Sequence, residues 1–412
     1  MAKASDQRCG GEFQSPRLQS LDAYRGLIMI SLSFAGFGLA ATAGNHLESN
    51  PDSGLWQQIH FQFSHAQWVG CSYWDLIQPS FMFMVGVSMA YSYLGRQRRG
   101  DSYRKMLGHA FTRSIILIAL SIFLMSKSRG YTDWSFMNVL AQIGLGYTFL
   151  FLLWGKSFKT QAVTGALILA GTWIVYEVSP NSGIDLASGS PEVGVTAEWA
   201  EENLEGIHPA WHKNANIGHT IDWWLLNSFP RPEPFEFNQG GYQTINFIPS
   251  LVTMLFGLMC GELLRSERRE YQKLGILIAA GILGLVVGQL LHVTGVCPLV
   301  KRIWTPSWAL FSTGSCCLIL AGLFAVIDMC GFRRWTFPLV VVGMNSIAIY
   351  CMSMSLKPWT ARQLQTHLGD ELFTLYGGID SAFAPTIQAV MVGTVFWLVC
   401  YYMYRNKFFI RI

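Results

Sequence analysis

A histidine and an aspartate ten residues apart are the first candidates for chemistry in this chain. His65 and Asp75 lie in the stretch HAQWVGCSYWDL, which is too polar at its start to cross a membrane and too aromatic to be an ordinary solvated loop. Histidine has a pKa of about 6.5, so it can accept or deliver a proton at neutral pH. An aspartate at a helix start also stabilises the positive helix N-terminus. The stretch is therefore a candidate proton-handling site, although a single histidine is more often structural.

Two other pairs have spacings that place both side chains on one face of a helix. Asp22 and Arg25, in SLDAYRG, are three residues apart and predict either a local ion pair or an arginine that helps to bind an anionic ligand. His208 and His212 have a spacing that zinc ligands use. Pro209 follows the first histidine, however, and no acidic neighbour completes an HExxH pattern. We expect no metal site.

The elements that must position these residues are apolar segments. Of the 412 residues, 51% are hydrophobic and only 13% are charged, which is not the composition of a soluble globular protein. A helix of about 20 apolar residues crosses a bilayer. Ten segments are long enough, and they predict an all-α, polytopic membrane helix bundle: 22–44, 74–94, 108–126, 136–154, 160–178, 246–264, 274–292, 304–327, 336–356 and 383–404.

The distribution of basic residues predicts the orientation of these segments. Cytoplasmic loops collect Lys and Arg when helices insert, and with both termini in the cytoplasm the inner segments hold 21 of the 29 basic residues. Lys301 and Arg302 are an exception, because this topology puts them outside. The first 16 residues are polar and lack the apolar core of a cleavable signal peptide, so we expect the first span itself to direct insertion.

Charge and motif content narrow the possible functions. The net charge of +4 follows mainly from the topological bias, and no basic, aromatic-interleaved patch indicates nucleic-acid binding. The nine cysteines form neither a CxxC metal pattern nor a disulfide framework. Gly284 and Gly288 have the GxxxG spacing that predicts close helix packing. We expect a single membrane domain over 1–412, with a long extracytoplasmic loop at 179–245.

Five blocks, spread over nearly the whole chain, carry a family resemblance. They are RLQSLDAYRGL at 17–27, HAQWVGCSYWDLIQPSFMFMVG at 65–86, LAQIGLGY at 140–147, HTIDWWLL at 219–226 and VGMNSIAIY at 342–350. In order and interval these blocks resemble the heparan-alpha-glucosaminide N-acetyltransferases and their bacterial relatives, which are polytopic membrane acyltransferases. The C-terminal YRNKFFIRI is also similar.

The resemblance implies a reaction and residue roles. Family members move an acetyl group from cytosolic acetyl-CoA to an amino sugar on the far side of a membrane, and His65 matches the histidine assigned to catalysis. It would act as a general base or be acetylated itself. Asp75 would position the histidine or seal the mouth of the bundle, and Asn345 would donate a hydrogen bond to the thioester or the developing oxyanion. A helix-end charge and a contact between helices remain the structural alternatives for Asp75 and Asn345.

Three departures from the family pattern concern the donor and the acceptor. Gly36 stands where an asparagine is common, Gln142 where an arginine is usual, and 238–241 (Asn-Gln-Gly-Gly) where the family has Asp-Pro-Glu-Gly. The lost arginine weakens the case for the same CoA phosphate contacts. The candidates for binding the donor are then Gln142 itself and, at the inner mouth, Arg25 and Arg113. The lost acids weaken the case for the same cationic amino-sugar acceptor.

Candidates for acceptor binding lie on the predicted outer side. Asp222 occupies the Ile-Asp position of the family. Trp68 and Trp223 are candidates for stacking on a sugar ring, although tryptophans near span ends are mostly interface anchors.

The leading interpretation is a membrane acyltransferase that takes an acyl group from cytosolic acyl-CoA and modifies an extracytoplasmic sugar or envelope glycan. A transporter or flippase that uses Asp75, Asp222 and Asn345, and a relative that has lost catalysis, are the alternatives. The absence of a lysosomal-type N-terminal extension favours a bacterial cytoplasmic membrane. Partners would be the lipid bilayer, the acyl donor and the acceptor glycan, and a homodimer is left open.

Overall fold

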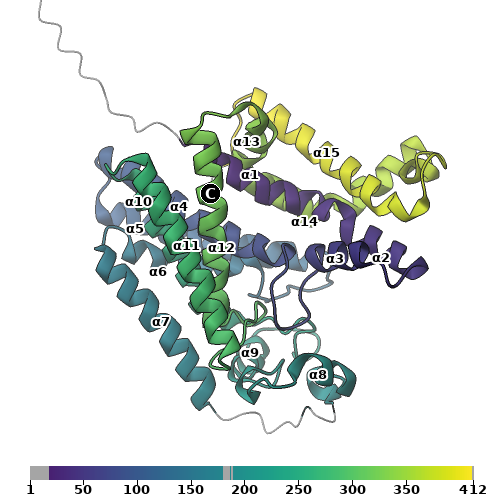
Figure 1. The fold of residues 1–412 in the computed structure, drawn as a ribbon, viewed down its shortest axis with the longest axis horizontal. Coiled ribbons are helices and arrows are strands. Elements are labelled where there is room, and N and C mark those ends of the chain that lie inside the picture. The colour runs from purple at the N-terminus through teal and green to yellow at the C-terminus, as the bar shows by residue number, and fades with distance from the viewer. Residues whose placement is uncertain (1–17, 180–185, 187–188, 411–412) are drawn as a thin grey trace, which may run out of the picture.

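Long helices make up most of the structure, a computed structural model that describes residues 18–179, 186 and 189–410. In this part of the chain two isolated β-bridges occur and no strand. The helices drawn in Figure 1 are, in chain order, α1 (Gln19–Ser33), α2 (Leu39–Ser49), α3 (Gly54–Phe63), α4 (Ile77–Arg98), α5 (Tyr103–Ser126), α6 (Val139–Leu153), α7 (Phe158–Val178), α8 (Ala197–Leu204), α9 (Ile217–Asn227), α10 (Phe247–Arg265), α11 (Glu270–Val293), α12 (Pro306–Leu323), α13 (Phe337–Gly343), α14 (Ser346–Leu368) and α15 (Ala384–Arg405).

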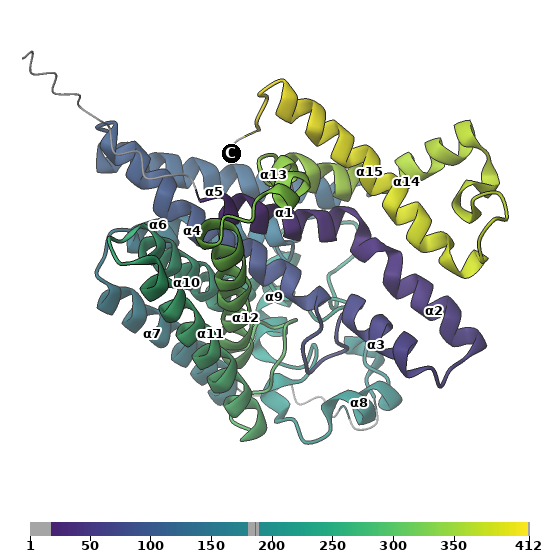
Figure 2. The ribbon, with the colours of Figure 1, turned by 45° about the horizontal axis from the view of Figure 1, so that its top comes forward.

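The bundle has two distinct ends. The C-terminus and α13 lie at one end, which we call the C-terminal end, and α8 lies at the opposite end in both views (Figures 1 and 2), with α9 beside it in Figure 1. Residues 189–243, which contain α8 and α9, form a cap, and we call this second end the cap end. Helix α12 begins near the cap and runs towards the C-terminal end (Figure 1).

The described residues contain six helices that are long and apolar enough to cross a membrane, namely α5, α7, α10 with the turn before it, α11, α12 with the π-helical turn after it, and α15 with the turn before it. Two bent pairs, α1 with α2 and α13 with α14, pass the same test together, with bends of 46° and 69°. Helices α4 and α6 fall in two more of the predicted segments but do not pass. The structure therefore supports a helical membrane protein with six to eight candidate spans in its described part, rather than the predicted ten.

Polar side chains fix the starts of several helices. Asn138 Oδ1 accepts a hydrogen bond from Leu140 N at 2.9 Å, and Ser157 Oγ accepts one from Thr160 N at 3.2 Å. The first backbone N–H groups of a helix have no partner within the helix, so such caps stabilise the start by about 1 kcal/mol. The register of α6 and α7 thus follows from short polar residues directly before apolar runs.

Glycines bring neighbouring helices into close contact. A Cβ atom at Gly86 of α4 would lie 1.8 Å from Met254 O of α10. On α11, Cβ atoms at Gly284 and Gly288 would lie 2.8 Å and 2.7 Å from backbone oxygens of α12. These distances are shorter than van der Waals contact, so the backbones approach only because side chains are missing. The predicted packing role of Gly284 and Gly288 is confirmed.

Two apolar clusters hold the molecule together. The larger one joins α1, α4, α6, α10 and α12 along the bundle. The smaller one joins the cap to the connections before α4 and α12, and it includes Trp68, Trp211 and Val300. Because the second cluster contains residues from all three segments, it fixes the cap against the connection that carries His65.

Candidate active site

His65 lies in the irregular connection between α3 and the 3-10 turn Trp74–Leu76, which leads into α4. Its Nδ1 is 2.7 Å from Asp75 Oδ1. The other carboxylate oxygen of Asp75 accepts hydrogen bonds from Ala66 N at 3.1 Å, Ser72 N at 3.2 Å and Ser72 Oγ at 3.0 Å. Only 1% of the Asp75 side chain is exposed. The structure thus brings together the two residues that the sequence singled out, and the charge of Asp75 is held by directed donors rather than by water.

These contacts fix the tautomer of His65. The Asp75 carboxylate is surrounded by donors and so has no proton to give, which means that the proton in the 2.7 Å contact belongs to His65 Nδ1. Nε2 has no hydrogen-bond partner among the described residues, and 39% of the His65 side chain is exposed. Burial lowers the pKa of His65, and the hydrogen bond to Asp75 opposes this only in part. The imidazole is therefore neutral at pH 7, with a free basic nitrogen, which is the state that a general base requires.

Lys301 is the third member of the cluster, and no role was predicted for it. Its Nζ lies 3.2 Å from Asp75 Oδ1 and 3.0 Å from His65 Nδ1. The side chain is 6% exposed, and burial lowers its pKa to about 8, with the nearby carboxylate of Asp75 opposing the shift. The signal in the sequence was the misplaced pair Lys301 and Arg302 on the predicted outer side. Lys301 is buried and paired with Asp75, and Arg302 is half-buried and hydrogen-bonded to backbone carbonyls, which gives this exception to the charge pattern a physical reason.

Backbone contacts place Lys301 beside His65 and Asp75. Val69 and Val300 form an antiparallel bridge, and Gly70 N donates to Leu299 O at 3.0 Å. The connection that carries His65 is therefore paired with the segment directly before Lys301.

Arg302 links the same connection to the cap. It donates to Ala66 O at 3.3 Å and to Gly240 O at 2.8 Å. Gly240 belongs to the stretch 238–241, in which Asn238 Oδ1 accepts from Gly240 N at 2.9 Å and closes a turn. A Cβ atom at Gly240 would lie 3.2 Å from the Arg302 guanidinium, so an acidic residue of the family pattern would stand beside this arginine. Here no carboxylate among the described residues forms an ion pair with Arg302, and the surroundings of His65 are cationic.

Asp222 and Gln142 converge on the turn before α10. Asp222 accepts from Thr244 N at 2.9 Å, and Gln142 Nε2 donates to Thr244 O at 3.1 Å and to Phe136 O at 2.8 Å. Both side chains are buried, and burial raises the pKa of Asp222 to about 6. In this geometry the two residues hold the start of α10 against α9 and α6. Their predicted contacts with acceptor and donor stay predictions.

The two tryptophans proposed for sugar stacking differ in environment. Trp68 is 1% exposed, and its Nε1 donates to Trp211 O at 3.1 Å inside the smaller apolar cluster, so neither face of the ring is open. Trp223 on α9 is 55% exposed. The histidines of the cap have separate partners, since His208 Nδ1 lies 3.2 Å from Glu177 and His212 Nε2 donates to Ile207 O at 2.9 Å.

Three other predicted site residues do not meet His65. Asn345 lies in the break between α13 and α14 at the C-terminal end, where its Oδ1 accepts from Ile410 N at 3.2 Å. Arg25 forms the local ion pair with Asp22 at 2.6 Å, in accord with one of its two predicted roles. Arg113, on α5, donates to Tyr147 Oη at 3.0 Å. No contact joins Asn345 to His65 among the described residues, and the role of Asn345 in catalysis stays a prediction.

Gly36, which stands where the family has an asparagine, lies in a bend whose backbone conformation suits either residue. Ala35, Gly36, Phe37 and Gly38 all have positive φ, from 49° to 68°, at the bend between α1 and α2. Glycine adopts this left-handed conformation freely, and asparagine tolerates it better than most residues. The family's asparagine and Gly36 therefore suit the same bend, although the amide group is lost here.

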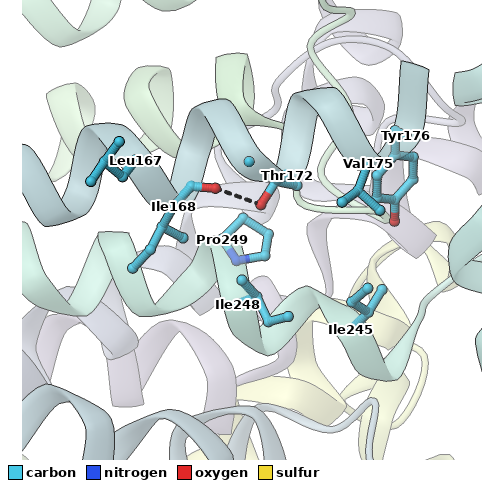
Figure 3. A pocket seen from close by; sticks show the side chains of 9 residues that line it. Leu167, Ile168, Thr172, Val175, Tyr176, Ile245, Ile248 and Pro249 are labelled. Carbon is cyan, nitrogen blue, oxygen red and sulfur yellow. Dashed lines mark hydrogen bonds between the residues drawn. The ribbon is translucent and has the colours of Figure 1, made fainter. Parts of the chain in front are cut away.

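Two cavities lie outside the His65 cluster. One, of about 540 Å³, opens at the C-terminal end and is lined by acidic, basic, polar and apolar side chains: Gln19, Asp22, Val340, Met344, Tyr404, Arg405, Lys407 and Phe409. The other, of about 240 Å³, lies between α7 and α10 and is apolar. In Figure 3 its walls include Leu167, Ile248 and Pro249, and the hydroxyl of Thr172 donates to Ile168 O within α7. Apart from Thr172 and Tyr176, which carry hydroxyl groups, the side chains that line this second cavity are apolar.

Comparison with known proteins shows which proteins the chain resembles. Over 96% of its length the chain is similar to the heparan-alpha-glucosaminide N-acetyltransferases of Homo sapiens, at 25% identity, and Mus musculus, at 23% identity. The chain is a distant relative of these heparan-alpha-glucosaminide N-acetyltransferases. The alignments cover 60% of each of the two proteins, so the chain spans about 60% of their length. No protein-family model matches the chain. The predicted resemblance to the heparan-alpha-glucosaminide N-acetyltransferases is confirmed.

Proposed function

We propose that this protein is a membrane acyltransferase that moves an acyl group, most simply acetyl, from acyl-CoA to a sugar or envelope glycan, with His65 as general base. The observation that carries the proposal is the buried Asp75 carboxylate, which holds His65 Nδ1–H at 2.7 Å and leaves Nε2 free. Similarity to N-acetyltransferases over 96% of the chain supports it independently.

The chemistry requires one proton to be held and returned. The acceptor amine or hydroxyl attacks the thioester carbonyl carbon and loses its proton to Nε2 of His65. The C–S bond breaks, CoA leaves as a thiolate, and His65 returns the proton to the sulfur. The products are the acylated acceptor and CoA thiol, and the histidine regains its starting state. Asp75 stabilises the imidazolium that forms between these steps, as the aspartate of a catalytic triad does.

The acceptor is expected to be an uncharged amine or a hydroxyl rather than an ammonium group. Lys301 and Arg302 lie beside His65, and Asp75 is the one carboxylate that the described residues bring to this cluster. A cation would be repelled by such surroundings. The loss of the acidic stretch at 238–241 supports the same expectation.

The donor is proposed to bind at the C-terminal end. The 540 Å³ cavity there has Arg405 and Lys407 in its wall, together with Asp22, which is paired with Arg25, and the two cations attract the phosphate groups of CoA. Asn345, next to the lining residue Met344, is buried, and its Nδ2 has no hydrogen-bond partner among the described residues. A ligand that accepts a hydrogen bond would satisfy this group.

For the topology we retain the proposal of ten spans with both termini in the cytoplasm, in which α4 and α6 cross together with the six to eight candidates. It puts the C-terminal end with its cavity inside and the His65 cluster outside. The distribution of 21 of 29 basic residues supports it. A cell membrane, bacterial in the simplest case, is the proposed location.

The test is the release of free CoA from acetyl-CoA by the purified protein in detergent, with a panel of amino sugars and neutral sugars. We expect release that depends on an acceptor and falls by at least about 100-fold in His65→Gln, since general base catalysis contributes on this order. His60→Gln is the control, because His60 is an exposed histidine on the neighbouring helix α3. Release that persists in His65→Gln would remove His65 from the mechanism. Binding of CoA without release would identify an inactive relative.

A transporter is the second candidate, because two bent helix pairs, at 46° and 69°, are found among the described residues and broken helices often form transport sites. Uptake of a labelled sugar into proteoliposomes without acyl-CoA would favour it. Acceptor-dependent CoA release without such uptake would exclude it.

A further inference from the structure

Lys301 meets His65 and Asp75 in a way that the proposed reaction does not yet use. We propose that Lys301 is a positioning residue, which rests on the proposed role of His65 and keeps that histidine neutral, with its Nδ1–H directed at Asp75 and its Nε2 free for the acceptor.

The geometry allows Lys301 only an indirect role. Its side chain is 6% exposed, and its Nζ is occupied by Asp75 Oδ1 at 3.2 Å. A nucleophile or a proton donor to substrate would need an open approach, which this ammonium group lacks. By contrast, 39% of the His65 side chain, which carries the free nitrogen, is exposed.

The position of Lys301 is built into the backbone and does not depend on a flexible loop. The bridge between Val69 and Val300 and the bond from Gly70 N to Leu299 O, at 3.0 Å, join the two connections directly before the cluster. After Lys301, the turn is closed by Trp304 N, which donates to Lys301 O at 2.9 Å. The ammonium group is thus presented to a buried carboxylate from a fixed turn.

The charges around His65 decide its protonation. The charged groups that face it are Asp75, from the turn before α4, and Lys301 and Arg302, from the connection before α12. A carboxylate alone favours the charged imidazolium, because opposite charges within a few ångströms attract. The ammonium of Lys301 supplies the counter-charge of Asp75 instead, and its distance of 3.0 Å from Nδ1 disfavours a second positive charge on the ring.

Asp75 and Lys301 thus have different effects on His65. Asp75 sets the tautomer by accepting from Nδ1, and Lys301 prevents the same carboxylate from drawing a proton onto Nε2. A methionine in place of Lys301 would keep an unbranched chain of similar length but would leave His65 as the main counter-ion of Asp75. His65 would then be protonated at higher pH and would fail as a base in the range where the native protein works.

The experiment measures the pKa of His65 without using turnover. Diethyl pyrocarbonate acylates only the neutral imidazole, so the labelling rate of the peptide that contains His65, followed by mass spectrometry from pH 4.5 to 8.5, reports its protonation. In the native protein we expect a midpoint below the value of about 6.5 for free histidine. In Lys301→Met we expect the midpoint to rise by about 1 to 3 pH units, the range found when one close charge is removed. Lys301→Arg, which keeps the charge, is the matched control and should leave the midpoint near the native value.

Each outcome supports or overturns the proposal. A native midpoint at or above 6.5, an unchanged midpoint in folded Lys301→Met, or an equal rise in Lys301→Arg would overturn it. The first of these criteria needs only the native protein, so it applies even if the methionine variant does not fold. Absence of labelling at any pH would contradict the free Nε2.

If acyl transfer is found, the acid limb of the pH profile of kcat/KM should move by the same amount in Lys301→Met. The labelling of the exposed histidine His60 is the internal control and should not differ between the variants. A protein that gives the expected labelling shift but no transfer would retain the role of Lys301 in setting the His65 pKa and refute the enzymatic function.

Discussion

Replacing Asp75 by asparagine should destabilise the fold by an amount that depends on Lys301. The change keeps the shape of the side chain but removes the charge that compensates a buried ammonium group, and Asp75 is the one carboxylate within 4 Å of Lys301 among the described residues. Removing one partner of a buried ion pair costs about 3 to 5 kcal/mol. An amide also cannot accept on both sides, so some of the donors from His65, Lys301, Ala66 and Ser72 would face an N–H group. We therefore expect a loss of at least about 3 kcal/mol in the free energy of unfolding.

The origin of this loss can be isolated with a second change. In the double variant Asp75→Asn with Lys301→Met the buried cation is gone, and we expect at least about 2 kcal/mol to return relative to Asp75→Asn alone, because a buried pair replaced by apolar groups is often neutral or stabilising. Asp75→Asn with Lys301→Arg keeps a cation at the same place and should not regain this stability.

The assay is reversible unfolding in mixed detergent micelles followed by tryptophan fluorescence, for the native protein and the three variants. Asp101→Asn is the control, since Asp101 pairs at the surface with Lys105, at 2.6 Å, and with Arg96, at 3.6 Å, and surface pairs contribute little. A double variant no more stable than Asp75→Asn would show that the charge of Lys301 is not what the carboxylate compensates, and the electrostatic argument would fail.

Two further predictions concern Asp222 and the contact between α4 and α10. Burial raises the pKa of Asp222 to about 6, so the folded state binds more protons than the unfolded state between about pH 4 and 6. The free energy of unfolding should therefore fall by about 3 kcal/mol as the pH rises through this window. Asp222→Asn should abolish that part of the pH dependence in unfolding titrations at pH 4.5 and 7, and an unchanged slope would contradict the assignment. Gly86→Ala places a Cβ atom 1.8 Å from Met254 O, so it should separate the two helices and greatly reduce the yield of monodisperse protein on gel filtration. Gly95→Ala on the same helix meets no atom closer than 3.8 Å and should be tolerated; equal yields for both variants would refute the close packing.

The sequence predicted most of the helices and two of the three residues of the cluster, His65 and Asp75. Apolar length is a local property, so the long helices could be located from composition alone. His65 and Asp75 are ten residues apart and lie on either side of a helix start, which made their pairing a reasonable hypothesis. The bends could not be predicted, because the left-handed conformation of Ala35 and Phe37 depends on packing around the turn and not on residue type.

Lys301 could not be assigned a role because its partner is 226 residues away in the chain. No periodicity or spacing relates residues at that distance, and only the fold brings them together. The sequence signal for Lys301 was an exception to the distribution of basic residues, because the predicted topology puts Lys301 and Arg302 on the outer side of the membrane. For the same reason, the convergence of Asp222 and Gln142 on Thr244 was not anticipated, since the three residues come from separate segments.

The contact between Asp75 and Lys301 also constrains how the chain crosses a membrane. Each crossing moves the chain to the other side, and two residues in contact at one end must be separated by an even number of crossings. Four of the helices between them, α5, α7, α10 and α11, are long and apolar enough to cross, while α4 and α6 are the two in question. By parity, α4 and α6 either both cross or both fail to cross. Chemical labelling of the single connection between α4 and α5, from one side of a sealed vesicle, therefore decides the status of two helices at once.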